Sequence, residues 1–251
     1  MKFTGQFLAA SAFLLTAHVS SVQASEFTDA QKAEIGPIVK EYLMKNPEVL
    51  KDVSMALQKK EAEQQASMAS SGIKENAEAI FRATGDQSEG NLKGKVTVVE
   101  FFDYNCPYCK RMTPAVAALL EGDKDVRVVM KEFPILGEGS VFASRAAAAS
   151  VLQGKYWPFH RALLAAEGRV DAGRVMKIAK DTGIDTDRLT KDMASADISK
   201  MLQVNNDLAG KLGINGTPAF VIGDQLYPGA IEASQLLTIV AEARTKACAV
   251  C

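Results

Sequence analysis

The chain has 251 residues, of which 47% are hydrophobic and 24% are charged, and its formal net charge is −1. This composition is typical of a globular protein and excludes an intrinsically disordered chain. The nearly neutral charge gives no electrostatic basis for binding nucleic acid or an anionic membrane. The length suits one domain with an extension, or two small domains.

Residues 1–24 predict a signal peptide. Lys2 supplies a positive start, an apolar stretch occupies residues 7–19, and the small-residue pattern Val22-Gln23-Ala24 predicts cleavage after Ala24. The apolar stretch is shorter than the ~20 residues that a membrane-spanning helix requires. We therefore expect a soluble, exported protein, in a compartment where paired cysteines tend towards disulfides.

Residues 25–72 predict an N-terminal helical extension. Apolar residues recur at helical spacing in residues 35–43, and Asn46-Pro47-Glu48 predicts that one helix stops and another starts. Residues 67–72 are small and polar, so we expect a flexible join there. The apolar stripes lack sustained heptads, which argues against a long coiled coil. A self-associating stalk and an arm folded on its own domain both remain open.

Residues 73–247 predict an α/β domain. A short helix is expected over residues 75–83 and a loop over 84–94. Residues 96–103 are β-branched and aromatic, which indicates a buried central strand, and residues 126–133 predict the next strand. A helix at 112–120 between these strands implies a parallel, right-handed βαβ unit.

The remainder of the domain is predicted to be mostly helical. Helices are expected throughout residues 141–210, and a helical insertion is placed at about 138–200. Short strands at 219–222 and 225–227, with a tight turn between them, predict a hairpin. A last helix from about 232 to 246 leads into the cysteine tail at 248–251.

The pair Cys106-Pro107-Tyr108-Cys109 follows the predicted central strand directly. At a helix start, unpaired N–H groups and the positive end of the helix dipole favour thiolate over thiol. Pro107 suits the first helical turn because its missing N–H is not needed there. We expect Cys106 to be the exposed, attacking sulfur and Cys109 the buried, resolving one.

Other uses of a C-x-x-C pair fit the sequence less well. A zinc ribbon needs two pairs about 15–20 residues apart, whereas Cys109 and Cys248 are far separated along the chain. A c-type haem attachment needs histidine where Lys110 stands. His160 is the one histidine left after signal removal, which argues against a histidine metal centre. A passive structural disulfide remains open.

The segment from Glu100 to Cys109 resembles the active-site strand and helix start of the DsbA-like thioredoxin superfamily. Pro114 matches the proline that kinks its active-site helix, Thr217-Pro218 matches its cis-proline, and residues 154–160 resemble a motif of its inserted helices. The similarity is greatest to the ScsC-like (Com1-like) set, which shares C-P-Y-C and an N-terminal helical extension. It implies an α/β thioredoxin fold with an inserted helical subdomain and that extension.

This resemblance implies roles for further residues. Pro218 is expected to be cis and to turn the Thr217 backbone towards the cysteines, with the Thr217 hydroxyl as a tuning group. Glu100 matches the buried acid beneath the active site, and we interpret it as a proton acceptor for Cys109, with Lys131 as its partner. The alternative is that Glu100 points outward at a strand end.

Tyr108 departs from DsbA, which has histidine at this position. A cation there further stabilises the thiolate, so Tyr108 predicts a less extreme redox poise. His160 is expected to be a packing residue of the inserted helices.

The predicted function is periplasmic thiol-disulfide exchange on exported proteins with cysteines, without a dissociable cofactor. An oligomer favours isomerisation of wrong disulfides and a monomer favours net oxidation, in either case with a membrane or periplasmic redox partner that the sequence does not name. The alternative is a copper-binding or copper-tolerance protein that uses thiolate pairs, including Cys248 and Cys251.

Overall fold

The structure is a computed structural model that describes residues 27–246 and Cys248, so the predicted signal peptide lies outside the described residues. The chain divides into two units, residues 1–57 and 58–251, and each is described by itself. Along the described residues, no helix has the length and apolar character to cross a membrane.

In the N-terminal unit, helix α1 (Asp29–Lys45) starts with a capping box between Thr28 and Gln31. It ends at Asn46, whose side-chain amide donates to the Tyr42 carbonyl at 2.8 Å. Helix α2 (Glu48–Glu75) starts two residues later, which confirms the predicted stop and restart. No residue of α1 is buried, and large apolar side chains are exposed on both helices: Ile35, Ile38, Val39, Tyr42, Met44, Leu50, Val53, Met55 and Leu57.

The prediction of a flexible join at residues 67–72 is wrong, because α2 runs through this segment without a break. Ala69 and Ile73 are buried in the core of the second unit, and this packing holds the helix despite its serines and glycine. A Cβ on Gly72 would lie 3.2 Å from the Leu212 side chain, so this glycine lets α2 approach the end of helix α9 (Ala196–Lys211) closely. Helix α3 (Ala77–Phe81) follows.

The second unit is built on a five-stranded mixed sheet in the order β1-β3-β2-β4-β5. Strands β2 and β3 are parallel and joined through helix α4, which confirms the predicted βαβ unit, whereas the other pairs are antiparallel. The bounds are β1 (Gln87–Gly90), β2 (Val96–Phe102), α4 (Pro107–Gly122), β3 (Val126–Glu132), β4 (Ala219–Ile222) and β5 (Gln225–Pro228).

Strand β1 lies where the sequence predicts a loop, at residues 84–94. Its sequence, Gln-Ser-Glu-Gly, has no apolar alternation, and it forms an edge strand that pairs with β3 through the backbone. A polar edge strand is held by backbone hydrogen bonds, so its residues show no alternation of apolar side chains from which a strand could be predicted.

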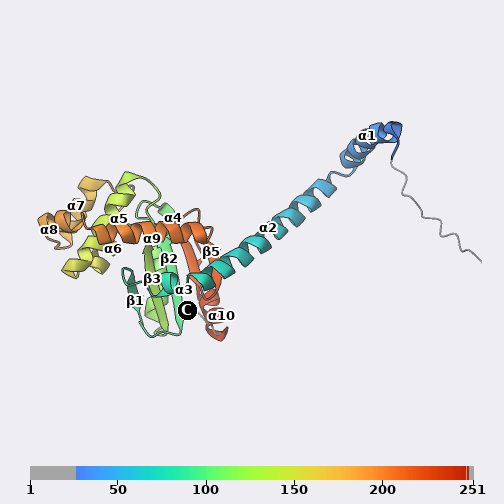
Figure 1. The fold of residues 1–251 in the computed structure, drawn as a ribbon. Helices are drawn as coiled ribbons and strands as arrows, with labels where there is room; N and C mark the ends of the chain where they lie inside the picture. The colour runs from blue at the N-terminus through green and yellow to red at the C-terminus, as the bar shows by residue number, and fades with distance from the viewer. Residues whose placement is uncertain (1–26, 247, 249–251) are drawn as a thin grey trace, which may run out of the picture. The chain divides into compact units, whose positions relative to one another are not determined.

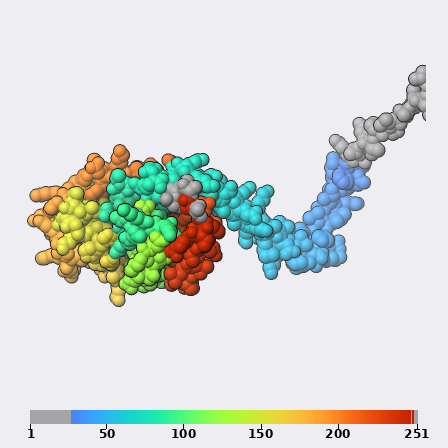
Figure 2. All heavy atoms as spheres, turned by 90° about the horizontal axis from the view of Figure 1, so that it is seen from below, coloured from blue at the N-terminus to red at the C-terminus, as the bar shows by residue number. Residues whose placement is uncertain are grey.

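Helices cover both faces of the sheet (Figure 1). Helix α4 and helix α10 (Ala233–Thr245) pack on one face, where Val98 and Phe102 of β2 point. The end of α2, α3 and α9 pack on the other face, against Val99 and Phe101. In Figure 2 the red atoms of α10 lie beside green atoms, in agreement with its contact with α4.

Between β3 and β4 the chain forms the expected run of helices. These are α5 (Glu138–Ser150), α6 (Tyr156–Ala165), α7 (Ala172–Asp181) and α8 (Thr186–Asp192), with a short 3-10 turn at Val151–Gln153. Their yellow and orange segments gather at one end of the second unit (Figures 1 and 2). The predicted end of the insertion near residue 200 falls inside α9, which returns the chain to the sheet.

Candidate active site

The two cysteines of C-P-Y-C lie at the start of α4, just beyond the end of β2. Cys106 is the N-cap residue with extended backbone, Pro107 occupies the first turn, and Cys109 points into the core. Both cysteines are free thiols, so the structure shows the reduced state. Cys109 is 1% exposed, as predicted, but Cys106 is only 4% exposed, so the prediction that it is exposed is wrong.

The loop before β4 accounts for the burial of Cys106. The Cys106 thiol donates a hydrogen bond to the Thr217 carbonyl, with 3.1 Å between Sγ and O. The Thr217–Pro218 peptide is cis, as predicted. The sheet register explains the meeting of residues 111 positions apart, because Ala219 of β4 pairs with Phe101 of β2, near the end that leads into the cysteines.

Glu100 lies inside the protein, on the α4 side of the sheet. Its register partners are Met130 and Phe220, which belong to the core cluster that also contains Cys109. The side chain is buried, so the alternative of an outward-pointing strand-end residue does not hold. Burial raises the pKa of Glu100 to about 8. Burial also raises the pKa of the Cys109 thiol, and the negative charge of Glu100 raises it further.

The prediction that Lys131 partners Glu100 is wrong. Glu100 is in register with Met130, so Lys131, one residue further along β3, points to the opposite face of the sheet. There the Lys131 ammonium donates to the Ala79 carbonyl and forms a buried salt bridge with Asp86. Burial lowers the pKa of Lys131 and raises that of Asp86, and their mutual attraction opposes both shifts.

Tyr108 and Pro107 form the exposed part of the motif. The Tyr108 side chain is 52% exposed, and the Arg111 guanidinium lies over its ring, 4.4 Å from the centroid. This cation–π contact positions the ring at the surface beside Cys106. Tyr108 therefore offers an apolar contact to a molecule that reaches the cysteine pair.

Asp103 is a residue of the site that the sequence analysis did not single out. Its buried carboxylate accepts hydrogen bonds from the Asn105 N–H and the Ser140 hydroxyl, both at 2.7 Å. It also accepts from the N–H groups of Ile135 and Leu136, at 2.8 and 3.0 Å. Asp103 thus fixes the turn before Cys106. A polar Asp-x-Asn pattern between a buried strand and the motif is the signal that could have indicated this role.

The same turn is tied to the helical insertion by two further side chains. Asn105 accepts from the Val170 N–H at 2.6 Å and donates to the Val170 carbonyl at 3.1 Å. The Lys110 ammonium donates to the carbonyls of Ala166 and Gly168, each at 2.6 Å. The loop between α6 and α7 is therefore held against the active-site segment.

His160 lies in a buried aromatic cluster rather than beside the sulfurs. Its Nδ1 is 2.9 Å from the Tyr104 hydroxyl, and its ring stacks on Tyr156. Both tyrosine hydroxyls donate to Glu132 at 3.0 Å. Burial lowers the pKa of His160 to about 3 and raises that of Glu132 to about 8, so the histidine is neutral at pH 7. These contacts agree with the predicted packing role of His160.

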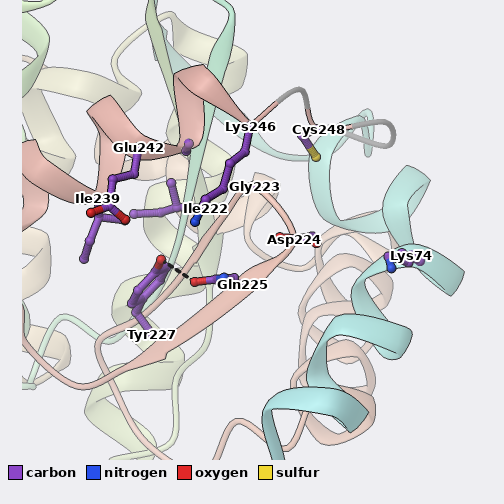
Figure 3. Close-up of a pocket in the computed structure, with 11 residues that line it drawn as sticks. Lys74, Ile222, Gly223, Asp224, Gln225, Tyr227, Ile239, Glu242, Lys246 and Cys248 are labelled. Carbon is purple, nitrogen blue, oxygen red and sulfur yellow. Dashed lines mark hydrogen bonds between the residues drawn. The ribbon is translucent and has the colours of Figure 1, made fainter.

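Cys248 lies apart from this site, in a cavity of about 270 Å³ between the β4–β5 turn and the end of α10 (Figure 3). Lys74, Asp224 and Lys246 line the same cavity. Cys248 is disulfide-bonded, and in that state it lacks the thiolate that Cu(I) requires. Cys251 lies outside the described residues. Among those described, no group of three or more histidine, cysteine or acidic side chains is arranged to hold a metal ion.

The parallel βαβ unit, the cysteine pair at the start of its helix and the cis-proline beside the first sulfur define a thioredoxin-type fold with a dithiol site. A family model described as the DSBA-like thioredoxin domain matches residues 97–241, and one described as the copper resistance protein ScsC N-terminal domain matches residues 31–64. The chain belongs to the DSBA-like thioredoxin domain family and carries an ScsC-type N-terminal domain.

Solved structures agree with this assignment. A thioredoxin-like oxidoreductase from Silicibacter pomeroyi DSS-3 is 47% identical, with coverage of 67% of this chain and 97% of its own and a TM-score of 0.66. Proteus mirabilis ScsC in a transitional conformation is 35% identical, with coverage of 88% and 98% and a TM-score of 0.65. The Na(+)/H(+) antiporter NhaA 3 of Salinispora tropica is 30% identical over 146 residues, 57% of this chain, and the chain spans 22% of that relative's length.

Proposed function

We propose that the protein is an exported, periplasmic thiol-disulfide oxidoreductase that exchanges disulfides with cysteine-containing exported proteins. The observation that carries the proposal is the arrangement of the two thiols: Cys106 at a helix start against the Thr217 carbonyl, and Cys109 buried on the same side as Glu100. A helix start favours the thiolate, which is the reactive form in exchange.

The exchange takes place in two thiolate attacks. The Cys106 thiolate attacks one sulfur of a substrate disulfide, forming a mixed disulfide and releasing one substrate thiolate. The Cys109 thiolate then attacks the Cys106 sulfur, closing the Cys106–Cys109 disulfide and releasing the second substrate thiolate. The substrate gains two electrons and the enzyme loses two, and the reverse sequence oxidises a substrate dithiol.

Glu100 is proposed to take the proton that Cys109 must lose before it attacks. Because burial raises the pKa of Cys109, this thiol holds its proton strongly and needs an acceptor nearby. A carboxyl whose pKa lies at about 8 can both accept and return a proton near neutral pH. Thr217 and Pro218 are proposed to bind the substrate backbone beside Cys106, with Pro107 and Tyr108 as tuning residues.

The direction of exchange is proposed to follow the oligomeric state. The exposed apolar side chains of α1 and α2 support self-association of the N-terminal unit, because such surface is normally buried against a partner. An oligomer with several dithiol sites favours isomerisation, whereas a monomer favours net oxidation. Either direction requires a membrane or periplasmic redox partner to restore the working state.

The test combines two ribonuclease assays with analytical sedimentation, which measures the mass of the protein and hence its oligomeric state. We expect the oligomer to restore activity to scrambled ribonuclease, and a monomer to oxidise reduced ribonuclease without reshuffling it. The Cys106→Ser variant is expected to lose both activities. Retention of either activity by that variant would overturn the proposal.

Copper protection is kept as a second candidate because the matched N-terminal domain is described as that of a copper resistance protein. This function would require the Cys248 disulfide to be reduced first. Cu(I) titration of the reduced wild type and of Cys248→Ser/Cys251→Ser tests it. Equal affinity in both proteins would remove the tail from consideration as a copper site.

A further inference from the structure

A cavity of about 620 Å³ lies between α4, α6 and the neighbouring strands β1 and β3. This volume falls within the range of small-molecule sites, roughly 300–1,000 Å³. The described residues that line the cavity include neither cysteine of the dithiol site and no residue of the cis-proline loop. The cavity is therefore a separate feature, which the proposed exchange reaction does not use.

The walls of this cavity are apolar, and one of them is aromatic. Aliphatic and methionine side chains from α4, β3 and α6 form most of the surface: Val116, Leu120, Val128, Met130 and Leu164. Trp157 of α6 completes the lining, and it is the only tryptophan in the chain. An apolar wall that contains an aromatic ring favours an aromatic ligand, which gains both from burial and from ring contact.

An ion pair beside the cavity links α6 to β1. The Arg161 guanidinium donates to the Glu89 carboxylate and lies over the Trp157 ring, 5.9 Å from the centroid. Arg161 and Glu89 both line the cavity, and because they are paired with each other, neither selects a ligand of opposite charge. Glu121, which also lines the cavity, is exposed to solvent. The lining therefore favours an uncharged ligand.

His160 brings a hydrogen-bond acceptor to the cavity. The residue is 5% exposed and lines the cavity, and its Nδ1 is 2.9 Å from the Tyr104 hydroxyl. That hydroxyl donates its single proton to Glu132, so the proton between Tyr104 and His160 belongs to Nδ1. In the neutral ring this leaves Nε2 without a proton and able to accept a hydrogen bond.

Nε2 of His160 has no hydrogen-bond partner in the described part of the chain. It is also not one of the polar atoms that are sealed from solvent without a partner, so it is open to the cavity that the ring lines. An acceptor in a nearly buried ring is costly unless a donor reaches it. A ligand in the cavity therefore gains by presenting an O–H group to Nε2.

We infer that this cavity binds a small, uncharged aromatic molecule with a hydroxyl group, of the phenol class. Its ring lies against Trp157, and its hydroxyl donates to His160 Nε2. The inference goes beyond the proposed thiol-disulfide exchange, and it assigns His160 a binding role in addition to its packing role.

The first test titrates the full chain with para-butylphenol and with para-butylanisole, in which a methyl group replaces the hydroxyl hydrogen. Because Trp157 is the only tryptophan, a change in tryptophan fluorescence reports binding at this wall. We expect a saturable change with the phenol and an affinity about tenfold higher than that of the anisole, equivalent to ~1.4 kcal/mol.

Partition into an apolar surface without the hydrogen bond would favour the anisole, which has no O–H group to desolvate. Equal or tighter binding of the anisole would therefore overturn the inference. The absence of a saturable fluorescence change with the phenol would overturn it as well.

The second test locates the ligand. Ala117→Phe is designed to fill the cavity from α4, because Ala117 is exposed and lines it. Ala118→Phe is the matched control, since Ala118 is the exposed neighbour that does not line the cavity. We expect Ala117→Phe to weaken binding of para-butylphenol about tenfold and Ala118→Phe to bind it as the wild type does. Equal affinity in the two variants would contradict the assigned place.

His160→Phe keeps a ring in the aromatic cluster but removes the acceptor, so it is expected to bind the phenol and the anisole equally. A retained preference for the phenol would overturn the assignment of His160 and the inference with it. If this variant does not fold, the two ligands on the wild type and the Ala117→Phe result decide the question.

The inference and the proposed function fail separately. Cys106→Ser/Cys109→Ser is expected to bind para-butylphenol with the affinity of the wild type. Loss of binding in this variant would place the ligand at the dithiol site and overturn the inference. A wild type that binds the phenol but exchanges no disulfide would end the proposed function and leave the inference standing.

Discussion

The two faces of the central sheet each bury an ionisable side chain, but in different surroundings. On the α2–α3–α9 face, Lys131 is paired with Asp86 and hydrogen-bonded to the Ala79 carbonyl. On the α4 face, Glu100 is buried beside the Cys109 thiol, and burial is the one cause that raises its pKa, to about 8. Adjacent strands thus carry two different buried groups: Lys131 in an ion pair with Asp86, and Glu100, which is largely protonated at neutral pH.

This difference separates a structural group from a reactive one. A buried charge with a partner stays ionised and contributes to stability only while both partners remain. A buried acid without a cation nearby changes protonation state near neutral pH, which a resting structural residue does not require. The contrast predicts that variants on the Lys131 face change stability alone, whereas variants at Glu100 change both the chemistry and the pH dependence of stability.

The largest expected effect is on stability at the Lys131 face. Lys131→Met leaves Asp86 buried without its cation, and we expect the free energy of unfolding to fall by about 3–5 kcal/mol. Urea denaturation measures this loss. Lys131→Met/Asp86→Leu is the control, and it is expected to recover most of the stability. A loss of exchange rate in the folded single variant would contradict the structural role.

The next effect is on the pH dependence of stability. The folded pKa of Glu100 is about 8, above its ordinary value of 4.5, so the native state holds a proton that the unfolded state releases between these pH values. The contribution of Glu100 is therefore fully present below about pH 4.5 and is lost as pH rises towards 8, by a few kcal/mol. Glu100→Gln is expected to flatten this part of the stability curve. An unchanged slope would show that Glu100 ionises normally.

Glu100→Gln should also slow the resolving step. Without the proton acceptor, attack by Cys109 is expected to slow about 10²-fold, while the first attack by Cys106 is unaffected. Quenched-flow alkylation measures the accumulating mixed disulfide. Glu132→Gln is the matched control, because Glu132 has the same raised pKa but is held by Tyr104 and Tyr156. Equal accumulation in both variants would argue against a specific role for Glu100.

The smallest expected effect concerns Tyr108. An imidazolium at this exposed position stabilises the neighbouring thiolate and hence the reduced enzyme, so Tyr108→His is expected to raise the reduction potential by about 30 mV. Equilibration with glutathione buffers measures the potential. Tyr108→Phe is expected to leave it unchanged, and an equal rise in both variants would assign the effect to the lost hydroxyl.

The sequence correctly predicted the elements whose burial produces a recognisable pattern of apolar residues. The apolar run of β2 and the cysteine pair after it were placed correctly from the residues, and the cis Thr217–Pro218 bond was expected from the resemblance to the DsbA-like superfamily. Strand β1 was missed because a polar edge strand is fixed by its pairing with β3 rather than by its own residues. Elements that depend on their own residues were therefore predicted, and an element that depends on pairing with a distant strand was missed.

The errors within the site have the same origin. The partner of Lys131 depends on the register of β2 with β3, which placed Met130, not Lys131, beside Glu100. The burial of Cys106 depends on a loop 111 residues away. Both the register and the loop contact depend on residues far apart in the chain, so neither is encoded in a local sequence pattern.

The most direct test of the central claim is to trap the intermediate. In Cys109→Ser the resolving sulfur is absent, so incubation with a protein that carries an accessible disulfide is expected to leave a stable mixed disulfide on Cys106, detected by mass spectrometry after proteolysis. Dithiothreitol should release it. No adduct on Cys106, or the same adduct yield in Cys106→Ser/Cys109→Ser, would contradict the assignment of Cys106 as the attacking sulfur.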